Sequence, residues 1–115
     1  MEPLVMIVDD EPINVRVFPR MLTEHGIHCM TALSGAECLQ KIDERKPDVI
    51  LLDAMMPVMN GFELARHLKA NPETNFIPLV MVTALTDLEA RIRALDAGVD
   101  DFLSKPVDYA ELLAR

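Results

Sequence analysis

The sequence lacks tryptophan, and only 4% of its residues are aromatic, so large rings cannot supply most of a hydrophobic core. Half of the residues are apolar, which means that the core must be built from aliphatic side chains and methionine. No apolar run approaches the roughly 20 residues of a membrane-spanning helix, and no basic flank precedes the first apolar run. We therefore expect a cytoplasmic protein with neither a membrane segment nor a signal peptide.

Basic residues and cysteines are also scarce. Eleven Lys and Arg against 19 Asp and Glu give a formal net charge of −8, which argues against binding of a nucleic acid backbone by this domain. The two cysteines, Cys29 and Cys38, have no paired spacing and no metal-type histidine spacing around them, so we interpret them as reduced thiols that serve as small apolar side chains. A length of 115 residues predicts one domain over residues 1–115.

Short apolar runs alternate with segments in which apolar residues recur every three or four positions. The recurring spacing is typical of amphipathic helices, and nearly continuous apolar runs are typical of strands covered on both faces. This alternation predicts an α/β fold with a single, doubly wound, five-stranded parallel sheet. The predicted strands comprise residues 4–8, 27–32, 48–52, 77–82 and 101–104.

Helix boundaries have clear local signals. Pro12 suits a first helical turn, and Gly26 and Gly98 fall where helices should end. Pro19 lies inside the first helical pattern, where we expect it to kink the helix. Four capping-box patterns, each with a Glu three residues after the cap, begin at Ser34, Asn60, Thr86 and Asp108.

Chemically useful side chains follow four of the five predicted strands: Asp9 and Asp10, Asp53, Thr83 and Lys105. Parallel strands bring their carboxyl ends to one edge of the sheet, so these side chains should meet there. Each alone has a plainer interpretation, as a loop acid, a turn former, a helix cap or a surface charge. Their occurrence at four separate strand ends favours a shared site.

Three clustered carboxylates repel one another and require a cation, and an all-oxygen ligand set favours Mg²⁺, which commonly shares its coordination with phosphate. A Lys ammonium and a Thr hydroxyl would then spread the charge of a phosphoryl group in transfer. Asp53 would be the nucleophile, since carboxylates form aspartyl phosphates. The later pair Asp100-Asp101 is expected to be a solvated acidic loop rather than a second metal site.

The segments VDDEP, ILLDAMMPVMNGFEL, VTAL and GVDDFLSKP resemble the signature segments of the receiver domain of two-component response regulators. The resemblance covers essentially the whole chain. It implies a flavodoxin-like sheet with strand order 2-1-3-4-5, and a signalling switch that catalyses only its own phosphorylation and dephosphorylation.

By this resemblance, Asp53 accepts a phosphoryl group from a phosphohistidine of a sensor histidine kinase or a phosphotransfer protein. Asp10 ligates Mg²⁺ directly and Asp9 mainly through water, with Asp53 and the backbone carbonyl of Met55 as further ligands. The family pattern, rather than the spacing of these residues, is the basis for each of these assignments.

The resemblance also implies that Lys105 pairs with the acyl phosphate and that the Lys105–Pro106 bond is cis. Thr83 and Phe102 would form the switch, and the face of the fourth helix, fifth strand and fifth helix would be a homodimer or output surface. Arg115 falls inside the last predicted helix, so we expect this helix to be truncated and the downstream output domain of a longer protein to be absent from this sequence.

Two other functions are considered. A pseudo-receiver would bind partners without phosphorylation, although the full set of site residues argues against it. A phosphatase similar to the haloacid dehalogenases would need an acid two residues after the nucleophile, where this chain has Met55. Because neither Met55 nor Leu85, which flank the expected path of an attacking water, can orient that water, we also expect slow self-dephosphorylation.

Overall fold

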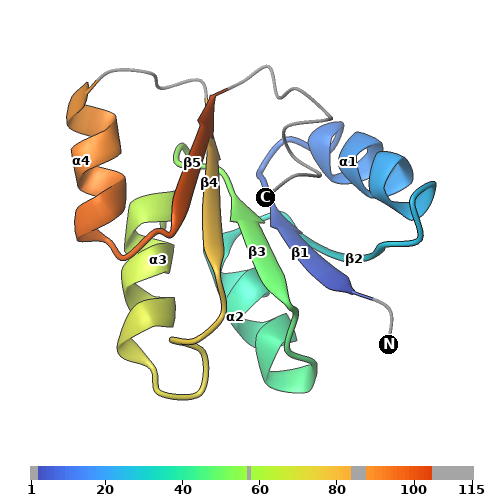
Figure 1. The fold of residues 1–115 in the computed structure, drawn as a ribbon, viewed down its shortest axis with the longest axis horizontal. Coiled ribbons are helices and arrows are strands. Elements are labelled where there is room, and N and C mark those ends of the chain that lie inside the picture. Colours follow the sequence, from blue (N-terminus) through green and yellow to red (C-terminus); the bar gives the residue numbers. More distant parts are fainter. Residues whose placement is uncertain (1–2, 57, 84–87, 105–115) are drawn as a thin grey trace.

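The computed structural model of the chain describes residues 3–56, 58–83 and 88–104. Within these ranges the strands and helices alternate as predicted (Figure 1). They form, in chain order, β1 (Leu4–Val8), α1 (Asn14–Thr23), β2 (His28–Ala32), α2 (Gly35–Glu44), β3 (Val49–Leu52), α3 (Gly61–Ala70), β4 (Leu79–Thr83), α4 (Leu88–Asp96) and β5 (Asp101–Ser104).

The five strands form one sheet in the order β2-β1-β3-β4-β5, and all of the strand pairs are parallel. Both the predicted sheet and the strand order implied by the resemblance are thus confirmed. Strand β4 begins at Leu79, two residues later than predicted, because the Ile77 N–H bonds to the Thr74 carbonyl in a turn and Pro78 has no N–H.

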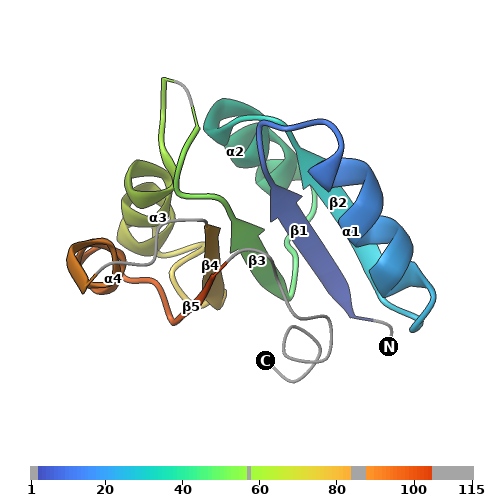
Figure 2. The ribbon, with the colours of Figure 1, turned by 90° about the horizontal axis from the view of Figure 1, so that it is seen from above.

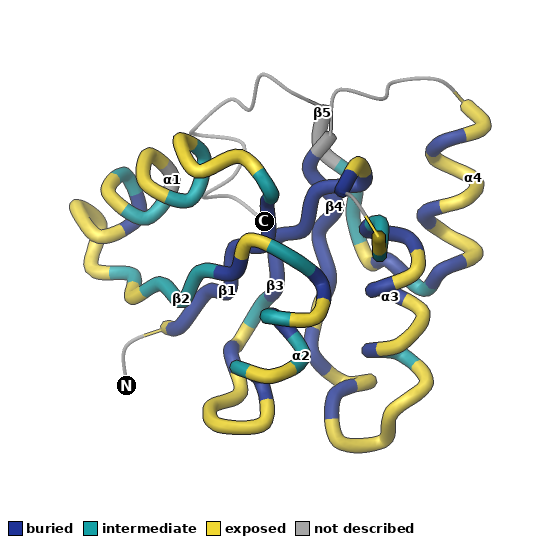
Figure 3. Tube along the Cα trace, turned by 180° about the vertical axis from the view of Figure 1, so that it is seen from behind, coloured by how far each residue is buried: buried dark blue, intermediate teal, exposed yellow. Residues whose placement is uncertain are grey.

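Alternate side chains of the sheet enter two separate cores. On β1, Met6 and Val8 belong to a large cluster that α2, α3 and α4 cover, whereas Val5 and Ile7 belong to a smaller cluster with Leu22 of α1. Figure 2 shows α1 on one side of the sheet and the other three helices on the opposite side. The inner strands β1, β3 and β4 are accordingly the most buried part of the fold, the edge strand β2 is only partly buried, and the helices expose their outer faces (Figure 3).

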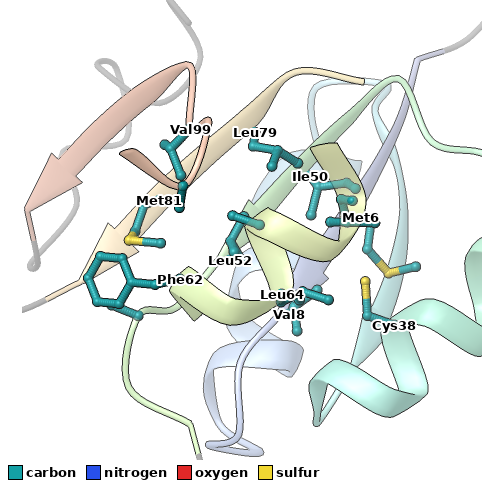
Figure 4. Packing of buried hydrophobic residues seen from close by; sticks show 14 of the residues in the cluster. Met6, Val8, Cys38, Ile50, Leu52, Phe62, Leu64, Leu79, Met81 and Val99 are labelled. Carbon is teal, nitrogen blue, oxygen red and sulfur yellow. The ribbon is translucent and has the colours of Figure 1, made fainter. Parts of the chain in front are cut away.

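The large core is aliphatic and rich in methionine, as the composition predicts. Met6 and Met81 are fully buried, and the Phe62 ring lies beside Met81, whereas Met6 lies near Cys38 at the other end of the cluster (Figure 4). Among the described helices, none has the length and apolar character needed to cross a lipid bilayer.

Of the two capping-box patterns that the structure describes, the one at Asn60 is complete, whereas only half of the one at Ser34 forms, because the Glu37 carboxylate accepts from the Leu33 N–H at 3.2 Å. The Ser34 hydroxyl accepts a hydrogen bond from the Glu37 N–H, and Asn60 and Glu63 form a complete capping box. The predicted caps Thr86 and Asp108 lie outside the described residues. Pro12 lies two residues before α1 rather than in its first turn, since α1 begins at Asn14.

Asp100 was predicted to be a solvated loop acid, but its side chain also connects parts of the fold. Its carboxylate accepts hydrogen bonds from the Leu79 N–H at 2.8 Å and from the Lys69 ammonium at 3.1 Å. Lys69 also donates to the carbonyl oxygens of Asn75 and Ile77, each at 3.1 Å. One ammonium therefore ties the end of α3 to the start of β4 and to the turn before β5.

Helix α1 continues through Pro19, which lies in its interior. A proline at this position removes the hydrogen bond to the carbonyl of Val15 and crowds that carbonyl. We therefore expect Pro19→Ala to raise the free energy of unfolding by about 1–3 kcal/mol, measured by urea denaturation. Pro12→Ala is the control, and it should lower stability slightly because it only frees the unfolded chain. An unchanged midpoint for Pro19→Ala would mean that packing of the half-buried ring compensates for the lost bond.

Candidate metal centre

Three aspartates converge at the carboxyl edge of the sheet, as predicted. Val8 of β1 lies opposite Leu52 of β3, and the Asp53 N–H extends this pairing by donating to the Val8 carbonyl at 3.0 Å. Asp9 and Asp53 therefore leave neighbouring strands at the same level. One carboxylate oxygen from each of Asp9, Asp10 and Asp53 lies within 4.8 Å of the others.

The carboxylates differ in their access to water. Asp9 is 3% exposed and Asp53 is 7% exposed, while Asp10 is half-buried. Like charges at this separation repel one another by a few kcal/mol in a partly buried setting. A bound cation would offset this repulsion, and a donor set made only of carboxylate oxygens fits a hard divalent ion such as Mg²⁺.

Two hydrogen bonds orient the Asp9 carboxylate. Its Oδ1 accepts from the Glu11 N–H at 3.0 Å, and its Oδ2 accepts from the side-chain amide of Asn14 at 2.9 Å. Such bonds from surrounding groups fix the direction in which a carboxylate presents its lone pairs to a metal. The function of Asn14 was missed from the sequence, because a single Asn near a helix start is typical of a cap.

The Asp53 carboxylate contacts the loop that follows it. Its Oδ1 accepts a hydrogen bond from the Met55 N–H at 3.3 Å, a long bond that holds the loop close to the acid. The Met55 side chain is 62% exposed, so its apolar atoms lie at the surface beside the acid rather than in the core. The ligand function of the Met55 carbonyl stays a prediction.

Gly61 is packed directly against the backbone of Asp53. A Cβ atom at position 61 would lie 2.1 Å from the Asp53 carbonyl oxygen and 2.9 Å from the Ala54 Cα. The Gly61 N–H also donates to the Ala54 carbonyl at 3.0 Å. Here glycine is required by a close approach between two backbone segments, and this contact fixes the first turn of α3 against the residue that carries the central carboxylate.

The remaining predicted residues lie partly outside the described chain. Thr83 ends β4 and pairs with Ser104 of β5, although the placement of its side chain falls outside the described part. Lys105 and Pro106 lie beyond the described residues altogether, so their predicted functions and the cis bond stay predictions. Phe102 on β5 is half-buried against the large core, and the Arg91 guanidinium lies 5.5 Å from the centre of its ring.

The cysteines take no part in this site. Burial raises the pKa of the Cys38 thiol to about 12, with a smaller contribution from the Glu37 charge, and burial also raises the pKa of Cys29. A raised pKa keeps a thiol protonated and poor as a nucleophile or metal ligand. Both thiols are free, in agreement with their interpretation as small apolar side chains.

The family model for the response regulator receiver domain matches residues 5–115. The chain belongs to the receiver-domain family of two-component response regulators. The resemblance seen in the signature segments is therefore confirmed, and the carboxylate cluster occupies a site at which receiver domains bind Mg²⁺.

Two relatives support this assignment. Response regulator PleD from Caulobacter vibrioides is 43% identical over 115 residues, which are 100% of this chain and 25% of PleD. The regulator PhoB from Rhizobium meliloti is 37% identical, over 100% of this chain and 51% of PhoB. The chain thus spans about a quarter to a half of these relatives.

A solved structure shows the same fold. The chemotaxis protein CheY4 from Vibrio cholerae aligns with a TM-score of 0.94 and 31% identity, and the match covers 99% of this chain and 95% of that one.

Gly61→Ala tests the contact with Asp53. We expect the added methyl group to displace the Asp53 carbonyl, to lower the free energy of unfolding by about 1–3 kcal/mol, and to weaken Mg²⁺ binding measured by calorimetry. Gly26→Ala is the matched control, since Gly26 has a φ of +76° but no atom within 4 Å of the new Cβ. It should lower stability without changing Mg²⁺ affinity. Unchanged Mg²⁺ affinity in Gly61→Ala would contradict a positioning function for Gly61.

Proposed function

We propose that this receiver domain accepts a phosphoryl group on Asp53 from a phosphohistidine of a histidine kinase or a phosphotransfer protein, and that Mg²⁺ is required. The observation that carries the proposal is that carboxylate oxygens of Asp9, Asp10 and Asp53 lie within 4.8 Å of one another, with Asp53 at the end of the central strand β3. Membership of the receiver family supports it.

In this proposal an Asp53 carboxylate oxygen attacks the phosphorus atom. The P–N bond to the imidazole breaks, its electron pair returns to the ring nitrogen, and an acyl phosphate forms. Asp10 and Asp53 would hold Mg²⁺, with Asp9 acting mainly through water and the Met55 carbonyl as a further ligand. Bound Mg²⁺ would neutralise part of the negative charge that two anions bring together. Lys105 would pair with the phosphoryl oxygens.

The domain would then act as a switch rather than as an enzyme with an external substrate. Thr83 would move to hydrogen-bond the acyl phosphate, and Phe102 would turn inward as Thr83 moves. Both steps belong to the proposal and come from the family pattern.

The outer face of α4 supports a partner or homodimer surface. Leu88, Ile92 and Leu95 are 73%, 49% and 70% exposed, and their spacing of four and three residues gathers them on one side of the helix. Ala90 and Ala94 occupy the opposite, buried side. We include in the proposal that this stripe, together with β5 and the predicted fifth helix, contacts a second copy of the domain or an output domain. The proposal also places the protein in the cytoplasm, with no nucleic acid or membrane binding by this domain.

Incubation with acetyl phosphate and Mg²⁺ tests the acceptor. We expect one phosphoryl group to be added to the wild-type domain, seen by intact-mass spectrometry and mapped to Asp53, and we expect none when Mg²⁺ is chelated. Asp53→Asn should abolish the adduct and Asp10→Asn should reduce it strongly, whereas the charge-matched control Asp43→Asn on α2 should behave as wild type. Absence of any adduct would favour the phosphorylation-independent pseudo-receiver.

Met55→Asn tests the lifetime of the phosphorylated form. A methionine offers no hydrogen bond to an attacking water, whereas an amide does, so we expect the first-order loss of phosphate to accelerate by up to about tenfold, which corresponds to ~1.4 kcal/mol. Val58→Asn is the control, because Val58 is fully exposed in the same loop and has a φ of 68° that Asn tolerates. Rapid loss of phosphate in wild type that Met55→Asn leaves unchanged would refute this explanation.

A further inference from the structure

Helix α4 packs against the rest of the domain through a face of small side chains. Its described buried residues are Ala90 and Ala94, followed by Ala97 just beyond the helix end, and its larger apolar side chains point away from the core. A methyl group buries little apolar area and does not interlock with grooves on a neighbouring surface as a Leu or Ile does. The alanine face alone therefore constrains the position of α4 weakly.

Two arginines add contacts of a different kind. The Arg91 guanidinium lies 5.5 Å from the centre of the Phe102 ring on β5, and the Arg93 guanidinium lies 4.2 Å from the centre of the Phe62 ring on α3. Both distances fall within the range of about 6 Å in which a cation is attracted to an aromatic face. Helix α4 is thus joined by its charged side chains to one ring on each side.

The two rings have different freedom to move. Phe62 is 1% exposed and lies deep in the large core, so Arg93 rests on a fixed support (Figure 4). Phe102 is only half-buried at the edge of that core, and it shares a surface pocket with Arg91, Leu95 and Val99. Because 5.5 Å is already near the limit for a cation–π contact, a rotation that carries the Phe102 ring inward would break its contact with Arg91.

We propose that Arg91 is a positioning residue that acts through Phe102: its guanidinium stabilises the half-buried arrangement of the ring and so opposes the inward arrangement of the switch. This inference rests on the proposed function, in which Phe102 turns inward when Asp53 is phosphorylated. Arg93 anchors the same helix to Phe62, so that Arg91 is presented to Phe102 from a helix of defined position.

The test uses the domain labelled with 4-fluorophenylalanine. The chain has four phenylalanines and should give four fluorine resonances, and the resonance that disappears in Phe102→Leu is that of Phe102. Beryllofluoride with Mg²⁺ is the mimic of the phosphoryl group. In the absence of the mimic, we expect the fluorine chemical shift of Phe102 in Arg91→Met to lie closer to the mimic-bound value than it does in the wild type. We also expect the apparent affinity for the mimic to rise by about two- to fivefold, the change equivalent to loss of one exposed cation–π contact.

Three variants control for other effects of the substitution. Arg91→Lys keeps a cation over the ring and should largely restore wild-type behaviour. Arg66→Met on the exposed face of α3 removes the same charge and should leave the Phe102 resonance and the affinity unchanged. In a Phe102→Leu background, Arg91→Met should have no further effect on affinity, since the two residues act as one coupled pair.

The outcomes separate this inference from the proposed function. If wild type binds the mimic but Arg91→Met matches Arg66→Met, or if the effect of Arg91→Met persists without the Phe102 ring, the inference is wrong and the proposed function stands. If wild type fails to bind the mimic in the presence of Mg²⁺, the proposed function fails and this inference fails with it.

Discussion

The pairing of β1 with β3 is the constraint on which the acidic site depends. Val8 and Leu52 are opposite partners, and the Asp53 N–H continues the ladder, so two carboxylates must emerge side by side where little water reaches them. Repulsion between their like charges opposes this arrangement, and the sheet would be stable without charged side chains at these two positions. A slip of one residue between these strands would turn the apolar side chains to the wrong faces, so the two cores that hold the register also hold the acids together.

The surrounding elements preserve this geometry by direct contact. Asn14 holds the Asp9 carboxylate from the start of α1, while Gly61 lets the start of α3 press against the Asp53 carbonyl. These contacts come from helices on opposite faces of the sheet. Asp9 and Asp53 are therefore each held by a strand and by the start of one helix, with the Glu11 N–H of the β1–α1 loop as an added contact to Asp9.

Much of this arrangement could be predicted from the sequence, because it follows from local patterns combined with one rule of topology. Apolar runs and capping patterns indicate the strands and helices, and parallel strands necessarily bring Asp9 and Asp53 to one edge. The contacts that could not be predicted depend on how the elements pack against one another rather than on a local sequence pattern. Lys69 and Asp100 are separated by 31 positions, and the pairing of Arg91 with Phe102 depends on how α4 is rotated against β5. The sequence pattern also cannot show that Gly61 is needed for a close approach rather than a turn.

The presence of methionine in the core has a consequence at the β4–β5 side of the sheet, where the proposed switch lies. Met81 of β4 is the direct partner of Phe102 on β5, and both side chains belong to the core on the same face. An unbranched thioether changes rotamer at low cost and fills irregular space, unlike a β-branched neighbour with a single preferred rotamer. The deformable side chain thus stands at the place where an aromatic ring would need new room, and the interior can absorb a rearrangement there without rebuilding the strands.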